Sequence, residues 1–210
     1  MTSSEDRMLA ATPGTPALGH FRRLRPMSRP APGSPTTMAD IEPTETTNLD
    51  GYGNAPLEWS RARDALSGDP TADLTHFLGT CRPDGTPHAA GVGAQWLDGD
   101  LYFTSGPAAR KARDLVVNPL CTISVRVPGM DLVLDGSAAR ITDPETLERV
   151  AAGYRAGGWP CQVEGDALTA PFSAPSAGPP PWHVYRFTFH TVVGVAGAEP
   201  HGATRWRFAR

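Results

Sequence analysis

The architecture of this chain follows from residues 77–115, which read FLGTCRPDGTPHAAGVGAQWLDGDLYFTSGPAARKARDL. Asp84-Gly85 lies between two strand-like runs and supplies the positive-φ residue that a hairpin turn needs. A second turn at 98–100 leads into residues 101–104, which again have strand character. Ser105-Gly106-Pro107 then has the residue types of a helix start. The segment therefore predicts a hairpin, a further strand and a short helix.

Three cations follow this predicted helix start: Arg110, Lys111 and Arg113. The first N–H groups of a helix have no partners within the helix and favour an anion, whereas cations there oppose the helix dipole. The pattern therefore predicts a phosphate site. The alternative is a solvated helix face, with Ala109, Ala112 and Val116 turned toward the core.

Small residues interrupt the strand-like segment 87–96, among them Ala89, Gly91 and Gly93. Such residues are poor strand formers, and in a sheet they mark places where another group approaches the backbone closely. A bend of a barrel or a close helix contact explains them equally well when the strand is considered alone. Beside the predicted phosphate site, they favour a surface on which a flat ring lies.

The remaining periodicity predicts a mainly β (α+β) domain. Helical spacing occurs at 57–66 and 143–156, and strand-like alternation occurs at 121–127, 131–141, 182–195 and 204–208. Gly136 predicts a bulge or bend within its strand. About six to eight antiparallel strands with about three flanking helices favour closure into a barrel, which removes sheet edges.

Composition excludes several classes of function. The chain has 210 residues, a formal net charge of −3 and no concentrated basic stripe, which argues against nucleic-acid binding. Cys81, Cys121 and Cys161 form no Cys-x-x-Cys pair and the six histidines form no ligand motif, so neither a disulfide framework nor a metal site is expected. No apolar run is long enough for a membrane span, and no secretory signal is recognised. A cytoplasmic location is expected.

Two segments lack periodicity. Residues 1–48 are rich in Pro, Thr, Ser and Arg and are expected to be a disordered extension of a domain that spans 49–210. Translation from Met27 or Met38, or a transit-type peptide, are alternatives for this segment. Residues 159–181 are expected to form a long loop at the mouth of a pocket.

The order of these motifs resembles the pyridoxamine 5'-phosphate oxidase-like split-barrel superfamily, and within it the flavin/deazaflavin oxidoreductases. The motifs that carry the resemblance are Phe77-Leu78-Gly79-Thr80, Arg82-Pro83-Asp84-Gly85-Thr86-Pro87-His88, Leu101-Tyr102-Phe103-Thr104-Ser105-Gly106, Arg110-Lys111-Ala112-Arg113-Asp114-Leu115 and Asn118-Pro119. The resemblance covers the chain from about residue 50 to its end. It implies a split β-barrel, a homodimer and a flavin-type cofactor in a groove at the dimer interface.

The resemblance also implies a set of cofactor-binding residues. Arg110, Lys111 and Arg113 would hold the phosphate, Thr104 and Ser105 would donate hydrogen bonds, Pro87, His88 and Ala89 would face the ring, and Trp206 would stack near the site from the partner chain. The strand 87–96 is uncharged, unlike that of the pyridoxamine phosphate oxidases, which favours coenzyme F420, with FMN as the alternative.

The expected activity is hydride transfer to a small organic acceptor, and no side chain is identified as its catalytic acid or base. Three alternatives remain. One is a protein that binds the cofactor without turnover, and another is a haem-handling member of the same superfamily with an axial ligand such as His88 or His183. The third is a structural barrel without a ligand.

Overall fold

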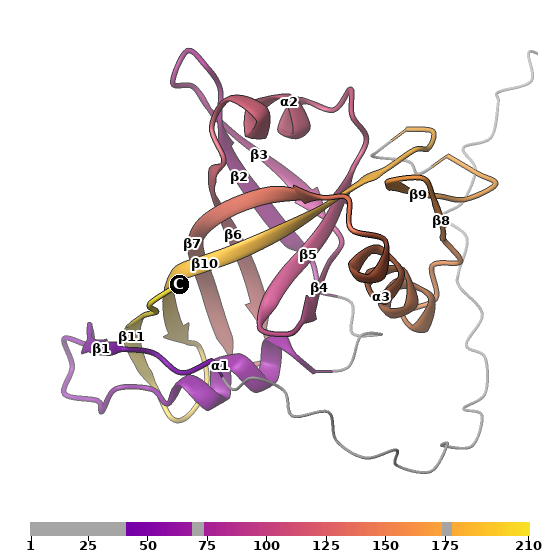
Figure 1. Cartoon of the computed structure of the whole chain (residues 1–210). Coiled ribbons are helices and arrows are strands. Elements are labelled where there is room, and N and C mark those ends of the chain that lie inside the picture. Colours follow the sequence, from indigo (N-terminus) through magenta and orange to yellow (C-terminus); the bar gives the residue numbers. More distant parts are fainter. Residues whose placement is uncertain (1–40, 69–73, 174–177) are drawn as a thin grey trace, which may run out of the picture. The chain divides into compact units, whose positions relative to one another are not determined.

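The computed structural model describes residues 41–68, 74–173 and 178–210 (Figure 1). Its helices are α1 (Trp59–Leu66), α2 (Arg110–Val117) and α3 (Pro144–Ala156). Its strands are β1 (Glu45–Asn48), β2 (His76–Cys81), β3 (Pro87–Val92), β4 (Ala94–Leu97), β5 (Asp100–Ser105), β6 (Leu120–Val127), β7 (Met130–Ile141), β8 (Gln162–Glu164), β9 (Ala167–Thr169), β10 (His183–Ala196) and β11 (Gly202–Arg207). The fold is therefore mainly β with three helices among the described residues, as predicted.

The main sheet is antiparallel and has the strand order β1-β11-β10-β7-β6-β2-β3. Strand β10 pairs with β7 along its whole length, with β5 over 183–187 and with β11 over 191–196. Because β10 exchanges one neighbour for another at mid-length, the β4–β5 ribbon branches from the main path and the barrel is split (Figure 1). The described part of this sheet has nine strands, more than the expected six to eight, because β1 was not anticipated and Gly93 separates β3 from β4.

A β-bulge lies where β10 changes neighbours. The register with β7 shifts between Phe189 and Thr191, opposite Gly136, so that His190 is the extra residue. A Cβ on Gly136 would lie 2.8 Å from the Cα of Phe189 and closer still to the carbonyl oxygen of Thr188. The bulge predicted at this glycine is therefore present, although the extra residue is on the partner strand.

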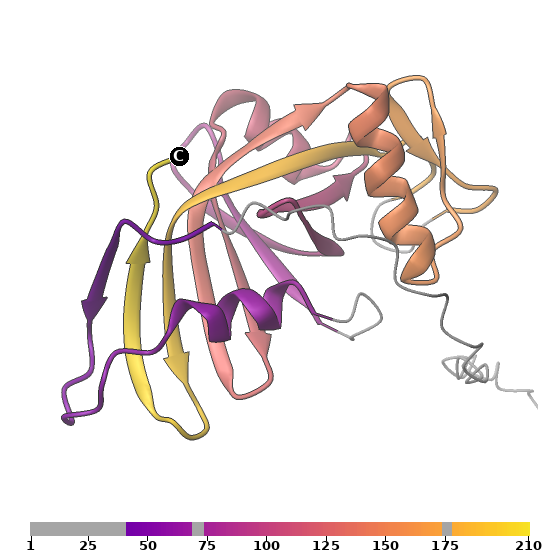
Figure 2. The same cartoon turned by 60° about the horizontal axis from the view of Figure 1, so that its bottom comes forward.

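Two apolar clusters lie within the domain. The larger one fills the barrel and includes the predicted inner face of α1, namely Trp59, Ala62 and Leu66. The smaller one packs α3 against β5, β9 and β10. α3 begins where predicted, because the Asp143 side chain accepts a hydrogen bond from the Thr146 N–H. Figure 2 shows α1 crossing one end of the strands and α3 flanking the sheet at the other.

Two sequence expectations are corrected by the described residues. Strand β1 lies within the segment expected to be disordered, because main-chain pairing with β11 orders it although its side chains bury little. Residues 159–181 are not entirely loop, since β8 and β9 form a hairpin there. Residues 1–40 lie outside the described residues, and so do the alternative starts at Met27 and Met38.

Across the described ranges, none of the helices combines the length and the apolar character that a bilayer crossing demands.

Candidate functional site

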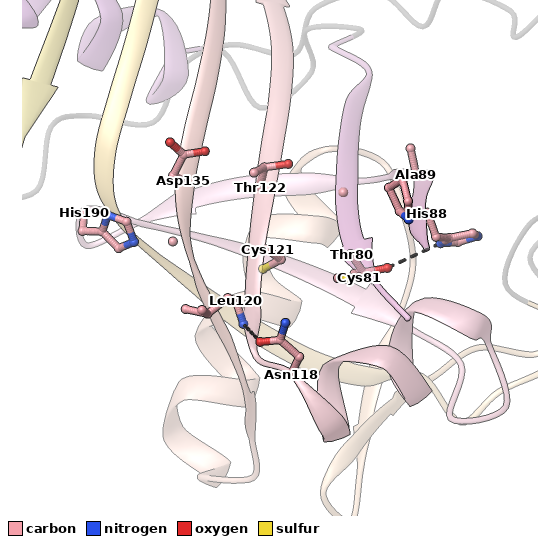
Figure 3. Close-up of a pocket in the computed structure, with 13 residues that line it drawn as sticks. Thr80, Cys81, His88, Ala89, Asn118, Leu120, Cys121, Thr122, Asp135 and His190 are labelled. Carbon is pink, nitrogen blue, oxygen red and sulfur yellow. Dashed lines mark hydrogen bonds between the residues drawn. The ribbon is translucent and has the colours of Figure 1, made fainter. Parts of the chain in front are cut away.

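An open pocket of about 640 Å³ lies beside the β2–β3 hairpin (Figure 3). The predicted ring-facing residues Pro87, His88 and Ala89 line it together. Strand β6 contributes Cys121, and the bulge of β10 contributes His190. We call this cavity the hairpin pocket.

A buried polar contact joins the hairpin to α2. The Thr80 hydroxyl donates a hydrogen bond to the Asp114 carboxylate at 2.9 Å, and Nδ1 of His88 lies 3.5 Å from the same hydroxyl oxygen. Thr80 and Asp114 are both buried. The contact therefore fixes the inner face of α2 against the strand that carries the hairpin pocket.

The first turn of α2 differs from the sequence expectation. The helix begins at Arg110 rather than at Pro107, because Gly106 to Ala109 form a turn in which the Ala109 N–H donates to the Gly106 carbonyl. Proline suits the second position of such a turn. Ala109 is the N-cap and offers no side-chain acceptor, so the first N–H groups of α2 remain available for an anion.

The three predicted cations do not share one side of α2. Lys111 lies on the inner face and is only 7% exposed, whereas Arg110 and Arg113 are exposed. Val116, expected toward the core, is exposed, and Leu115 is buried in its place. The expected inner stripe was therefore right at Ala112 and wrong at Val116, and the solvated face does not include Lys111. That the three cations hold one phosphate stays a prediction.

Lys111 has no partner in the described part of the chain. Its ammonium group forms no hydrogen bond or ion pair with any described residue, and burial lowers its pKa. Residues 111, 114 and 115 lie on one helix face by their spacing, so Lys111 is on the side that Asp114 turns toward β2. Most of the Lys111 side chain is buried, and its Nζ atom reaches solvent only at the surface. Partial loss of hydration without a partner is costly for an ammonium group, and a bound anion would reduce that cost.

The predicted hydrogen-bonding residues Thr104 and Ser105 lie at the end of β5. Thr104 is half-buried and pairs with Val184 of β10. Ser105 is fully buried, and its hydroxyl donates to the Gly106 carbonyl. The Ser105 hydroxyl is therefore engaged within the strand end and is not directed at the hairpin pocket.

Trp206 belongs to the barrel core. Its ring is fully buried, packs 5.6 Å from the ring of Trp59 and lies over Gly194, whose Cβ position is 2.8 Å from the indole. A fully enclosed ring cannot stack on a cofactor held by a partner chain. The placement of Trp206 near the site is therefore wrong, because alternation in β11 turns this side chain inward.

Sequence reasoning missed the pocket residues that long-range pairing supplies. Cys121 and His190 are brought to the hairpin pocket only by the sheet register and the bulge. Burial raises the pKa of the Cys121 thiol to about 12, so this thiol remains protonated at neutral pH. Lys111, in contrast, was among the predicted residues, and it is the only lysine among the 19 lysine and arginine residues of the chain.

The strand order and the β10 exchange define the class of fold as a split barrel. Residues 68–196 match the pyridoxamine 5'-phosphate oxidase family, and the chain belongs to this family. No match is found among curated proteins.

Solved structures of similar fold have low sequence identity to this chain. An F420 reductase is 22% identical, with a TM-score of 0.44 and coverage of 61% of this chain and 94% of its own. A putative pyridoxamine 5'-phosphate oxidase from Listeria innocua is 18% identical (TM-score 0.45, coverage 64% and 96%). A FAD-binding protein from Mesorhizobium loti is 20% identical (TM-score 0.46, coverage 71% and 94%).

Proposed function

We propose that this chain is an oxidoreductase that binds a flavin-type cofactor, coenzyme F420 or alternatively FMN, and transfers hydride to a small organic acceptor. The observation that carries the proposal is Lys111, the sole lysine, which is mostly buried at the uncapped start of α2 and has no partner among the described residues. A cofactor phosphate would pair with the ammonium group and accept hydrogen bonds from the first N–H groups of the helix.

The outer side of β3 fits a flat ring. Pro87, Ala89, Gly91 and Gly93 are all exposed, and β3 ends the strand order of the sheet. No atom of another described residue lies within 4 Å of the Cβ position at Gly91 or Gly93, so a contact with α1, α2 or α3 does not account for these glycines. The strand thus offers a smooth surface beside the hairpin pocket.

The bound cofactor would supply the hydride chemistry, and the chain would bind and orient it. In the proposed arrangement Lys111 holds the phosphate, and Pro87 and Ala89 support the ring. His88 is held near Thr80 at the rim of the hairpin pocket. None of these side chains is assigned the role of acid or base.

We further propose that the protein is a homodimer that associates through the outer face of β2, β6 and β7. Phe77 and Val133 are 52% and 41% exposed and lie in one row across this face, because both pair with Ser124. Leu120, at the edge of the hairpin pocket, is also exposed. A second copy on this face would cover the apolar side chains and close the hairpin pocket.

Light scattering coupled to gel filtration tests the dimer. Phe77→Asp is expected to yield monomers, whereas Phe172→Asp alters an exposed phenylalanine far along the chain and is expected to leave the dimer intact. A monomeric wild-type protein, or a Phe77→Asp variant that dimerises as before, would contradict this interface. Cell fractionation tests the cytoplasmic location, which is part of the same proposal.

Fluorescence titration with FMN and with coenzyme F420 tests the function. Lys111→Met is expected to weaken binding of the cofactor about 10- to 100-fold relative to the wild-type chain. Lack of binding of either compound, or binding that Lys111→Met leaves unchanged, contradicts the proposal.

Two further measurements separate the alternatives. Cofactor binding without reduction of any acceptor in a quinone and nitroaromatic panel supports the non-catalytic binding protein. A Soret band in the purified protein supports the haem-handling alternative.

A further inference from the structure

A second pocket, of about 330 Å³, is lined by α2 and by the strands β7 and β10. Arg113 of α2, Arg140 of β7 and His183 and Tyr185 of β10 line it. Tyr185 is directly opposite Arg140 in the antiparallel pairing, and His183 follows on the same strand face. We call these four residues the arginine pocket.

Among the described residues, the polar side chains of the arginine pocket have few hydrogen-bond or ionic partners. The side chains of Arg113, His183 and Tyr185 form no hydrogen bond or ion pair with any described residue. Within the described ranges, Arg140 has one ionic partner, Asp166, at 2.6 Å. The residues that line the pocket include two guanidinium groups and no carboxylate, and of these two groups Arg140 is paired with Asp166 from outside the lining. Such a lining favours an anion.

The rear wall of the pocket is aromatic and rigid. The Tyr185 ring is 5% exposed and stacks on Phe103, with ring centroids 5.3 Å apart and planes 8° from parallel. Burial and the nearby Arg140 lower the pKa of His183, so this imidazole is neutral at pH 7. A neutral imidazole and a phenol can each donate one hydrogen bond to an oxyanion.

We propose that the arginine pocket binds a small organic anion whose carboxylate or phosphate group lies between Arg113 and Arg140, with its apolar part against Tyr185. The planar fork of an arginine matches both groups. The pocket shares no residue with the Lys111 site or the hairpin pocket, so the inference goes beyond the proposed flavin function and does not depend on it.

Asp166 would act as an internal competitor for this anion. It lies in the turn between β8 and β9, and its carboxylate already occupies one side of Arg140. An entering anion must displace it or share the guanidinium group. Removal of this charge in Asp166→Asn is therefore expected to tighten anion binding.

Isothermal titration of the full chain with benzoate and with inorganic phosphate, at constant ionic strength, tests the site. Saturable binding of benzoate alone identifies a carboxylate ligand, and saturable binding of phosphate alone identifies a phosphate ligand. Arg113→Gln is expected to weaken that binding at least about tenfold. Arg140→Gln is expected to do the same, and Asp166→Asn to strengthen the binding about threefold or more.

Two controls make the result specific. Arg110→Gln removes an exposed arginine from the same helix outside the pocket and is expected to leave the affinity unchanged. Lys111→Met is expected to weaken flavin binding about 10- to 100-fold while keeping benzoate or phosphate binding, so failure of one site is distinguishable from failure of the other. The proposal is overturned if the wild-type chain binds neither anion, if Arg110→Gln and Arg113→Gln have equal effects, or if Asp166→Asn weakens binding.

Discussion

Replacement of Lys111 by methionine is expected to move two properties of the protein in opposite directions. Methionine has a similar length and no charge, so it removes the partly dehydrated ammonium group that has no partner among the described residues. The protein without cofactor should become more stable, because burial disfavours the charged form, as the lowered pKa of Lys111 indicates. Cofactor binding should become weaker, because the phosphate loses its only buried cation on α2.

The magnitude follows from the burial of Lys111. An unsatisfied buried polar group costs about 1–3 kcal/mol, and more when charged. Because 7% of the side chain still reaches solvent, we expect a gain of about 1–2 kcal/mol in the free energy of unfolding. For a domain of this size, that gain raises Tm by about 2–8 °C. Loss of a charge-assisted hydrogen bond should weaken flavin affinity about 10- to 100-fold.

Thermal and urea denaturation without ligand, together with a fluorescence titration of FMN or coenzyme F420, measures both effects. Arg110→Met is the matched control, since it removes an adjacent but exposed cation. It should leave the free energy of unfolding almost unchanged, in contrast to Lys111→Met. A Lys111→Met protein that is less stable than wild type and binds the cofactor equally well would refute the reasoning, because Lys111 would then be a structural residue.

Two further substitutions test the fold. Gly136→Ala should lower the free energy of unfolding, measured by urea denaturation, by about 2 kcal/mol or more, because its Cβ would meet backbone atoms of β10. Gly91→Ala is the control and should cost little, since the space around that Cβ position is open. Equal losses in the two variants would refute this account. His76 is buried, and burial lowers its pKa below the usual 6.5. At a pH between the folded-state pKa and 6.5, the unfolded chain therefore binds a proton at His76 that the folded chain does not bind. The free energy of unfolding falls as the pH drops through that range. His76→Gln should therefore lose less Tm than wild type between pH 7.5 and pH 5, and an equal loss in both proteins would contradict this role.

Local patterns in the sequence determined most of the elements. Strict alternation at 121–127 predicted β6, and the Asp84-Gly85 turn predicted the β2–β3 hairpin. The capping signal at Asp143 predicted the start of α3. These features depend on neighbours a few residues apart, so periodicity and turn chemistry reveal them. The same local reasoning brought Pro87, His88 and Ala89 together, because they are consecutive on one strand.

Features set by distant contacts were decided only by the tertiary structure. The hydrogen bond of Asp114 with Thr80 determines which face of α2 is turned toward β2. As a result, Lys111 is buried and Arg110 is exposed. Pairing with β10 turned Trp206 inward and placed His190 in the bulge. Such positions require the register between strands that are far apart in the chain, and a one-residue shift in that register reverses which side chains face the core.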